Sequence, residues 1–178
     1  MTTRILTCPV PENINPLSPN GYMFSLEKLP SLSFFCQEVT LPSLTLPEAT
    51  QLNPFTKISL AGDQLEFDSL RVQFLVDEKM ENYKAIHYWL ISLGFPENHE
   101  QYKNYMETVS IPGLSEVARS SSDATLTILG NTNNPVQTIQ FNDCIPESLE
   151  SLTFISTNQD VQYLIGSVTF KYTNYKFL

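Results

Sequence analysis

Two histidines and three cysteines are the side chains of this chain best suited to act as nucleophiles, bases or soft metal ligands. Neither His87 nor His99 belongs to a paired ligand motif such as HExxH. Cys8, Cys36 and Cys144 are widely separated, odd in number and form no CxxC pair. This spacing predicts reduced thiols, not a disulfide framework or a zinc site.

Carboxylates cluster at Asp63, Glu66 and Asp68, but carboxylates in a turn are more often solvated turn residues than an acid–base pair. The glycines are isolated, which excludes GxGxxG and the phosphate-binding P-loop, and GxSxG is also absent. The sequence therefore predicts a protein that is not an enzyme and uses no cofactor or metal. A hydrolase remains a distant alternative.

The composition indicates one substantial core in a chain of 178 residues. Only 16% of the residues are charged, against about 25% in typical globular domains. One interpretation is that neighbouring subunits cover much of the surface. A Ser/Thr/Asn-rich β-protein surface explains the composition equally well.

The net charge is -9, and the ten basic residues are scattered along the chain. Tight nucleic-acid binding needs several basic side chains that contact phosphates, so this pattern argues against a protein that binds DNA or RNA tightly. The chain shows neither a signal-peptide core nor an apolar run of about 18 residues, so we expect synthesis in the cytoplasm and no membrane insertion.

A strand that passes directly into a helix is the strongest local pattern. Residues 70–76 alternate between apolar and polar, as a strand with one buried face requires. The apolar spacing then changes to that of a helix at about 78–93, with Asp77 as its N-cap and Gly94 at its end. We expect five residues to pack this strand and helix onto the core: Phe74, Tyr83, Ile86, Trp89 and Leu90.

The remaining β pattern predicts hairpins. Residues 22–26 and 32–39 form an expected first hairpin, and residues 55–60 are expected to pair with the 70–76 strand through a turn at 61–63. After the helix, further strands are expected at 124–130, 136–142, 150–156 and 162–177.

Three segments define the expected domain organisation. Residues 1–20 contain four prolines and predict an extended N-terminal arm. Residues 21–178 form a single β domain, in which 97–123 is a long exposed loop. The predicted fold class is mainly β with one flanking α-helix, as an antiparallel barrel or sandwich.

The motif ISLAGDQLEFDSLRVQFLVDE, followed by NYKAIHYWLISLG, resembles the tail tube protein family of contractile-tailed bacteriophages. In that family an A-G-D turn, a Phe-Asp pair, an alternating strand and a Trp-containing helix occur in this order. FFCQEVTLPS is similar to the family's early strand, and SVTFKYTNYKF to its terminal strand.

The resemblance implies a structural virion protein of the phage tail, assembled in the host bacterial cytoplasm. Six copies would form a ring whose inner strands join into one barrel around a channel, and rings would stack into a tube. Tail sheath and baseplate proteins are the implied partners, and phage DNA would pass through without specific binding. Carboxylates lining the channel would repel phosphates, which would explain the acidic excess.

Two alternatives stay open. A tube initiator, baseplate hub, or terminator or adaptor ring would share the fold. A monomeric β-barrel ligand-binding module, using aromatic residues around Tyr163 and Tyr175, belongs to another class. We expect assembly interfaces in three segments, at Leu6, Pro9 and Pro16, at Ala61, Gly62, Asp63, Glu66 and Asp68, and at Pro112 and Gly113.

Overall fold

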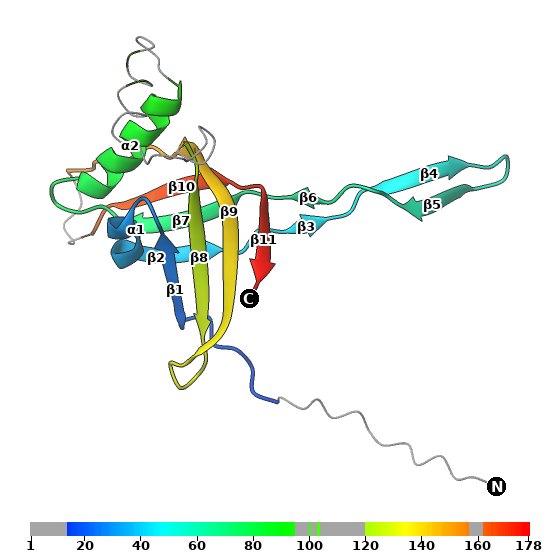
Figure 1. Cartoon of the computed structure of the whole chain (residues 1–178), viewed down its shortest axis with the longest axis horizontal. Helices are drawn as coiled ribbons and strands as arrows, with labels where there is room; N and C mark the ends of the chain where they lie inside the picture. The colour runs from blue at the N-terminus through cyan, green and yellow to red at the C-terminus, as the bar shows by residue number, and fades with distance from the viewer. Residues whose placement is uncertain (1–13, 95–99, 101–102, 104–119, 157–161) are drawn as a thin grey trace, which may run out of the picture.

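The computed structural model describes residues 14–94, 100, 103, 120–156 and 162–178. Antiparallel strands dominate these residues, together with one main helix, in agreement with the predicted fold class (Figure 1). The elements, in chain order, are β1 (Tyr22–Leu26), α1 (Pro30–Phe35), β2 (Cys36–Thr40), β3 (Leu44–Thr45), β4 (Glu48–Leu52), β5 (Lys57–Ala61), β6 (Glu66–Phe67), β7 (Leu70–Leu75), α2 (Glu81–Gly94), β8 (Ser122–Leu129), β9 (Pro135–Leu149), β10 (Ile165–Lys171) and β11 (Asn174–Phe177).

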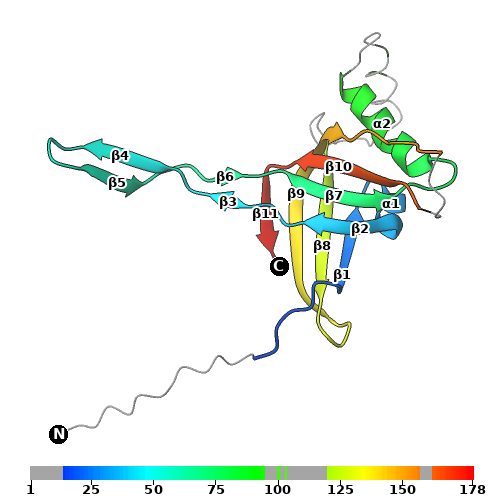
Figure 2. The same ribbon diagram turned by 180° about the vertical axis from the view of Figure 1, so that it is seen from behind.

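In the part of the chain that the structure describes, the body is one seven-stranded sheet that folds over itself into two layers. Its strand order is β1-β8-β9-β10-β7-β2, with β11 paired to β9 off this path. We call β1, β8, the first part of β9 and β11 layer A, and the end of β9 with β10, β7 and β2 layer B. The strands of the two layers cross, and the view from behind shows layer B in front (Figures 1 and 2).

Strand β9 belongs to both layers and changes partner along its length. Asn142 pairs with β11 in layer A, whereas Ile145 pairs with β10 in layer B. Between them Asp143 adopts a positive φ of 54°, a conformation that Asp tolerates better than most residues. Its carboxylate accepts hydrogen bonds from the hydroxyls of Ser121 (3.2 Å) and Thr173 (3.4 Å), which fix the passage between layers.

The core lies between the two layers, because alternate residues of each strand point inward. Trp89 of α2 adds to it: its ring centroid lies 6.2 Å from that of Phe170, and its indole N–H donates to the Ser120 carbonyl (3.0 Å). The buried apolar residues are Phe24, Leu26, Leu32, Leu70, Val72, Phe74, Ile86, Trp89, Ala124, Leu126, Ile139, Phe141, Cys144, Val168 and Phe170. Tyr83 and Leu90 pack against this core from its edge.

Helix α2 begins at Glu81, three residues later than the sequence predicted. Asp77 does accept a hydrogen bond from a helical N–H, that of Asn82 (3.2 Å), and Asn82 Oδ1 accepts from the Asp77 N–H (3.4 Å). Met80 between them has a φ of 57°, so a turn precedes the helix. The Asn82 amide also donates to the Leu75 carbonyl (2.7 Å), which ties α2 to the end of β7.

The predicted hairpin of 22–26 with 32–39 does not form. Strand β1 forms as expected, but it pairs with β8. Residues 30–35 form helix α1, with Pro30 in the first turn, and β2 then pairs with β7. A short continuous apolar run fits a buried helix and a strand equally well, and proline favours the first helical turn.

The predicted strands at 124–130 and 136–142 form as β8 and β9, joined by a turn in which the Gly130 N–H donates to the Asn134 carbonyl (2.8 Å). The two other strand predictions after the helix need correction. No strand forms at 150–156, and 162–177 is divided into β10 and β11. The division arises because β10 pairs in layer B and β11 in layer A, a change of partner that local alternation does not reveal.

The predicted loop at 97–123 lies mostly outside the described residues, although Ser122 and Asp123 belong to β8. Across the part of the chain that the structure describes, no helix is long and apolar enough to cross a membrane.

Candidate assembly surfaces

A long two-stranded ribbon projects from the body (Figure 1). It continues β2 outward through β3 and β4, turns, and returns through β5 and β6 to β7. β4 pairs with β5, β3 pairs with β6, and between them the Gly62 N–H donates to the Pro47 carbonyl (2.9 Å). We call residues 44–67 the arm.

The predicted pairing of residues 55–60 with the 70–76 strand is wrong, because residues 57–61 pair within the arm. Lys57–Ala61 pairs with Glu48–Leu52, and the reversal lies at the tip, where the Asn53 N–H donates to the Thr56 carbonyl (3.2 Å). The Asn53–Pro54 dipeptide is the turn signal that could have located this reversal in the sequence. Ala61 to Asp68 therefore forms the returning strand of the arm and its root, not a hairpin turn.

The arm has an apolar face and no core of its own. Strand alternation places Ala49 and Gln51 on one face with their partners Leu60 and Ile58. At the tip, Leu52 is 85% exposed and Phe55 is 95% exposed. A two-stranded ribbon is at best marginally stable alone in water, so this arm requires a surface to cover it.

The predicted carboxylate cluster is dispersed along the arm. Asp68 lies at the root, where its carboxylate accepts hydrogen bonds from the Ser69 N–H (2.7 Å) and the Ser43 hydroxyl (3.3 Å). Glu66 belongs to β6, and Glu66 and Asp63 are exposed. Asp68 therefore fastens the two strands where they leave the body.

The two edges of layer A form a second candidate surface. Among the described residues, β1 pairs only with β8, and β11 pairs only with β9. Unpaired strand edges invite association with another strand. Phe177 and Leu178 at the β11 edge are large, apolar and exposed.

A groove of about 490 Å³ lies along the β1 edge, between β1 and the start of β2. Its walls include Met23, Phe34 and Cys36. Phe34 is 84% exposed. Burial raises the pKa of Tyr22 to about 12, with a smaller contribution from Cys36, and burial likewise raises the pKa of the Cys36 thiol to about 11. Both groups are therefore neutral at pH 7, and the residues that line the groove are uncharged, with apolar and polar side chains mixed.

Four of the other predicted interface residues, Leu6, Pro9, Pro112 and Gly113, lie outside the described residues. Pro16 lines a different hollow with Leu17 and Val136, beside the β8–β9 turn. The structure thus brings Pro16 to the body and places the 61–68 residues on the arm.

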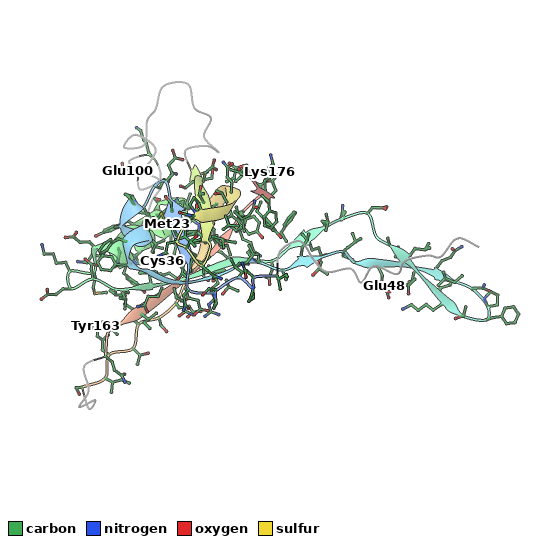
Figure 3. All side chains as sticks on the ribbon, turned by 90° about the horizontal axis from the view of Figure 1, so that it is seen from below. Met23, Cys36, Glu48, Glu100, Tyr163 and Lys176 are labelled. Atoms are coloured by element: carbon green, nitrogen blue, oxygen red, sulfur yellow. The ribbon has the colours of Figure 1, made fainter. Side chains whose placement is uncertain are left out.

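The aromatic residues proposed for a small-ligand site lie apart. Tyr163 lines a shallow hollow with Phe154 and Ile155, whereas Tyr175 packs against Phe67 with ring centroids 5.8 Å apart. Figure 3 shows Tyr163 and Lys176, the neighbour of Tyr175, on opposite sides of the body. Tyr163 and Tyr175 therefore do not form one aromatic surface.

The candidate chemical residues are separate as well. His87 is exposed on α2, with its ring 6.0 Å from that of Tyr88. Cys144 is buried in the core, and burial raises its thiol pKa to about 12. Within the described ranges, no three His, Cys, Asp or Glu side chains lie close enough to hold a metal ion.

Comparison with known families resolves the identity of this β body with its projecting arm. The phage tail tube protein family matches residues 12–178, almost the whole chain. The chain belongs to the phage tail tube protein family. Membership gives this tail tube protein a structural, tube-type role, in agreement with the resemblance noted in its sequence.

Solved structures with the same fold come from contractile injection systems. A chain of the anti-feeding prophage baseplate superposes with a TM-score of 0.62 at 14% identity, covering 92% of this chain and 96% of that one. A chain of the anti-feeding prophage tube-terminating cap gives 0.59 at 9% identity and covers 99% of both chains. A chain from a sheath–tube complex of the PVC extracellular contractile injection system gives 0.55 at 14% identity, covering 92% and 91%. No curated protein sequence matches the chain.

Proposed function

We propose that this tail tube protein is the repeating subunit of the tube, with six copies in each ring and rings stacked around a channel that conducts phage DNA. It would assemble in the host cytoplasm, become part of the virion tail, and meet sheath and baseplate proteins. The arm is the observation that carries this proposal. Its apolar face and tip are exposed in the single chain and need a second protein surface.

The arm suits heterologous contacts that repeat from one copy to the next. It binds a surface unlike itself, and such heterologous contacts generate rings or open-ended stacks. Another copy of the chain is the simplest partner, because every added copy supplies both an arm and a surface.

In this proposal layer A lines the channel, since no described element packs on its outward face (Figure 1) and, among the described strands, its edges are open. That face is mostly neutral, with two carboxylates and one lysine, so the acidic lining suggested by the resemblance would be weak here. Its residues are Met23, Ser25, Glu27, Asp123, Thr125, Thr127, Thr138, Gln140, Asn142, Asn174 and Lys176. Hydroxyls and amides would let a polyanion slide without ionic contacts.

A terminal ring is the second candidate, because chains of a baseplate and of a tube-terminating cap share this fold. A terminal ring would stop growing after one or two layers, whereas a tube subunit would polymerise.

Negative-stain electron microscopy over a range of concentrations tests the proposal. Hollow rods are expected for a tube subunit, and single rings would favour the terminal ring. Monomers at every concentration would count against both. Replacing Ile58, Leu60 and the tip residue Phe55 with Ser should prevent rods, whereas the matched variant on the other face, Thr50→Ala with Ser59→Ala, should form them normally.

A further inference from the structure

The free edge of β1 offers the backbone groups of two residues. The Leu129 N–H donates to the Gly21 carbonyl (2.8 Å), and the Glu27 N–H donates to the Asp123 carbonyl (3.1 Å). Because hydrogen-bonded positions alternate in antiparallel pairs, the odd-numbered residues of β1 bond to β8 and the even-numbered ones face away.

One of the even-numbered residues is already engaged. The Leu26 N–H donates to the Ser33 hydroxyl (3.4 Å), and the Leu26 carbonyl accepts from the Leu29 N–H (3.1 Å). The segment that contains α1 thus closes one end of the edge. Tyr22 and Phe24 remain for a partner strand.

The free edge of β11 likewise offers two residues. The Leu178 N–H donates to the Thr138 carbonyl (2.8 Å), in register with the pairing of β11 and β9. By the same alternation Lys176 bonds to β9, and the backbone groups of Tyr175 and Phe177 face away from it.

The strand directions and the spacing of the two edges match. Successive strands of layer A are antiparallel, so β1 and β11 run in opposite directions. Copies placed side by side therefore bring β11 of one copy antiparallel to β1 of the next. One register uses all four free residues: Tyr22 opposite Phe177, and Phe24 opposite Tyr175.

The side chains fit the same register. Phe177 lies on the core-facing side of layer A, opposite Ile139, yet is 60% exposed at the edge. The groove along β1 lies on the line where a neighbour's Phe177 would enter, next to the exposed Phe34. Figure 3 shows Met23 and Cys36, both from the groove wall, close together in the view from below.

We propose that β11 of one copy extends layer A of the next by pairing with β1 in this register, with Phe177 seated in the groove beside Phe34. The proposal rests on the proposed tube function and specifies the partner strand and register within a ring. It places Met23 of one copy directly opposite Lys176 of its neighbour.

Disulfide cross-linking tests the register. Met23 and Lys176 would form a non-hydrogen-bonded pair with Cα atoms about 4.5 Å apart, within the range for a disulfide. The double variant Met23→Cys with Lys176→Cys should give a ladder of covalent oligomers up to ring size on a non-reducing gel. The matched variant Met23→Cys with Asn174→Cys is shifted by two residues, to about 7–8 Å, and should cross-link at least tenfold more slowly. Each single variant controls for the native cysteines.

A proline substitution tests the backbone pairing. Phe177→Pro removes an N–H that points away from β9, so its monomer should match the thermal stability of the Phe177→Val monomer, which loses the same ring contact with Tyr175. Phe177→Pro should raise the concentration needed for rings at least tenfold, while Phe177→Val, which keeps the N–H, should raise it less. Rings that form without the predicted ladder, or with a faster ladder from the shifted pair, would overturn this register and leave the tube function standing. Failure of the unmodified chain to form any oligomer would overturn the tube function itself.

Discussion

The body and the arm are both antiparallel β-structure, yet they differ in side-chain burial: the body encloses a core, and the arm leaves its side chains exposed. In the body, every second residue of β7 is fully buried, and layer B closes over layer A. In the arm, every residue of β4 and β5 is exposed, although the two strands pair over five residues each. Pairing alone therefore does not account for the stability of a strand.

This difference separates folding from assembly within one chain. The body buries enough apolar area to fold as a single copy, whereas the arm gains comparable burial only against another surface. Substitutions in the body should therefore change the free energy of unfolding, and substitutions in the arm should change oligomer formation. Four predictions test that separation, in order of decreasing effect on stability.

The largest effect is expected for Phe74→Ala. Phe74 is fully buried between the layers, so its truncation should lower the free energy of unfolding by about 3–5 kcal/mol. Denaturant unfolding of the monomer measures this change. The same truncation at the arm tip, Phe55→Ala, should change it by less than about 0.5 kcal/mol. Comparable losses at both positions would show that the arm belongs to the folding unit.

A smaller loss is expected for Gly166→Ala in β10. A Cβ at this position would lie 2.8 Å from Cζ of Phe74, so the ring would have to shift. Overpacking of this kind costs about 1–3 kcal/mol. Combining Gly166→Ala with Phe74→Leu should cost less than the sum of the two single changes, measured as a double-mutant cycle. Simple additivity would contradict the contact.

Lys28→Met should stabilise the body modestly. Burial lowers the Lys28 pKa to about 8, with Glu27 partly opposing the shift, and its ammonium lies 5.2 Å from the centre of the Trp89 ring. The unfolded lysine binds its proton more tightly than the folded one. The resulting loss of folding free energy is therefore complete below pH 8 and declines between about pH 8 and 10.5. After a discount for solvent screening, the gain is about 1 kcal/mol at pH 7. Thermal melts of both proteins from pH 7 to 10 should converge.

The smallest effect on folding is expected for Gly62→Ala in the arm. A Cβ there would clash with the Pro47 carbonyl oxygen, a backbone atom that cannot move without separating the two strands. The body should unfold with a free energy within about 0.5 kcal/mol of the parent, because no core residue is touched. Light scattering should nevertheless show weaker assembly. Normal assembly would mean that the arm's pairing is not needed in the oligomer.

Local patterns in the sequence predicted the elements whose burial follows their own periodicity. The alternation of β1 and β7 and the helical stripe of α2 each reflect one buried face, so they are visible without knowledge of the partner. The turn cluster between β8 and β9 was equally clear.

Features that depend on distant partners were not predictable. Nothing in residues 32–39 indicates that β2 pairs with β7, and nothing in 162–177 marks the step from layer B to layer A. The sequence does not predict the arm, because the strands of the arm face no core and their apolar spacing points to pairing with the nearest strand pattern. Free edges are a property of the whole sheet and leave no local sequence signal.

The strands of the arm are direct continuations of β2 and β7, and this continuity has a mechanical consequence. Tension on the arm would pull both strands lengthwise in the same direction. β7 is held to β10 through the residue pairs from Leu70–Phe170 to Leu75–Ile165, whose hydrogen bonds lie across the strands. The load would therefore act on β7 and β10 as shear, shared by the whole row of bonds at once, instead of opening them one at a time from an end.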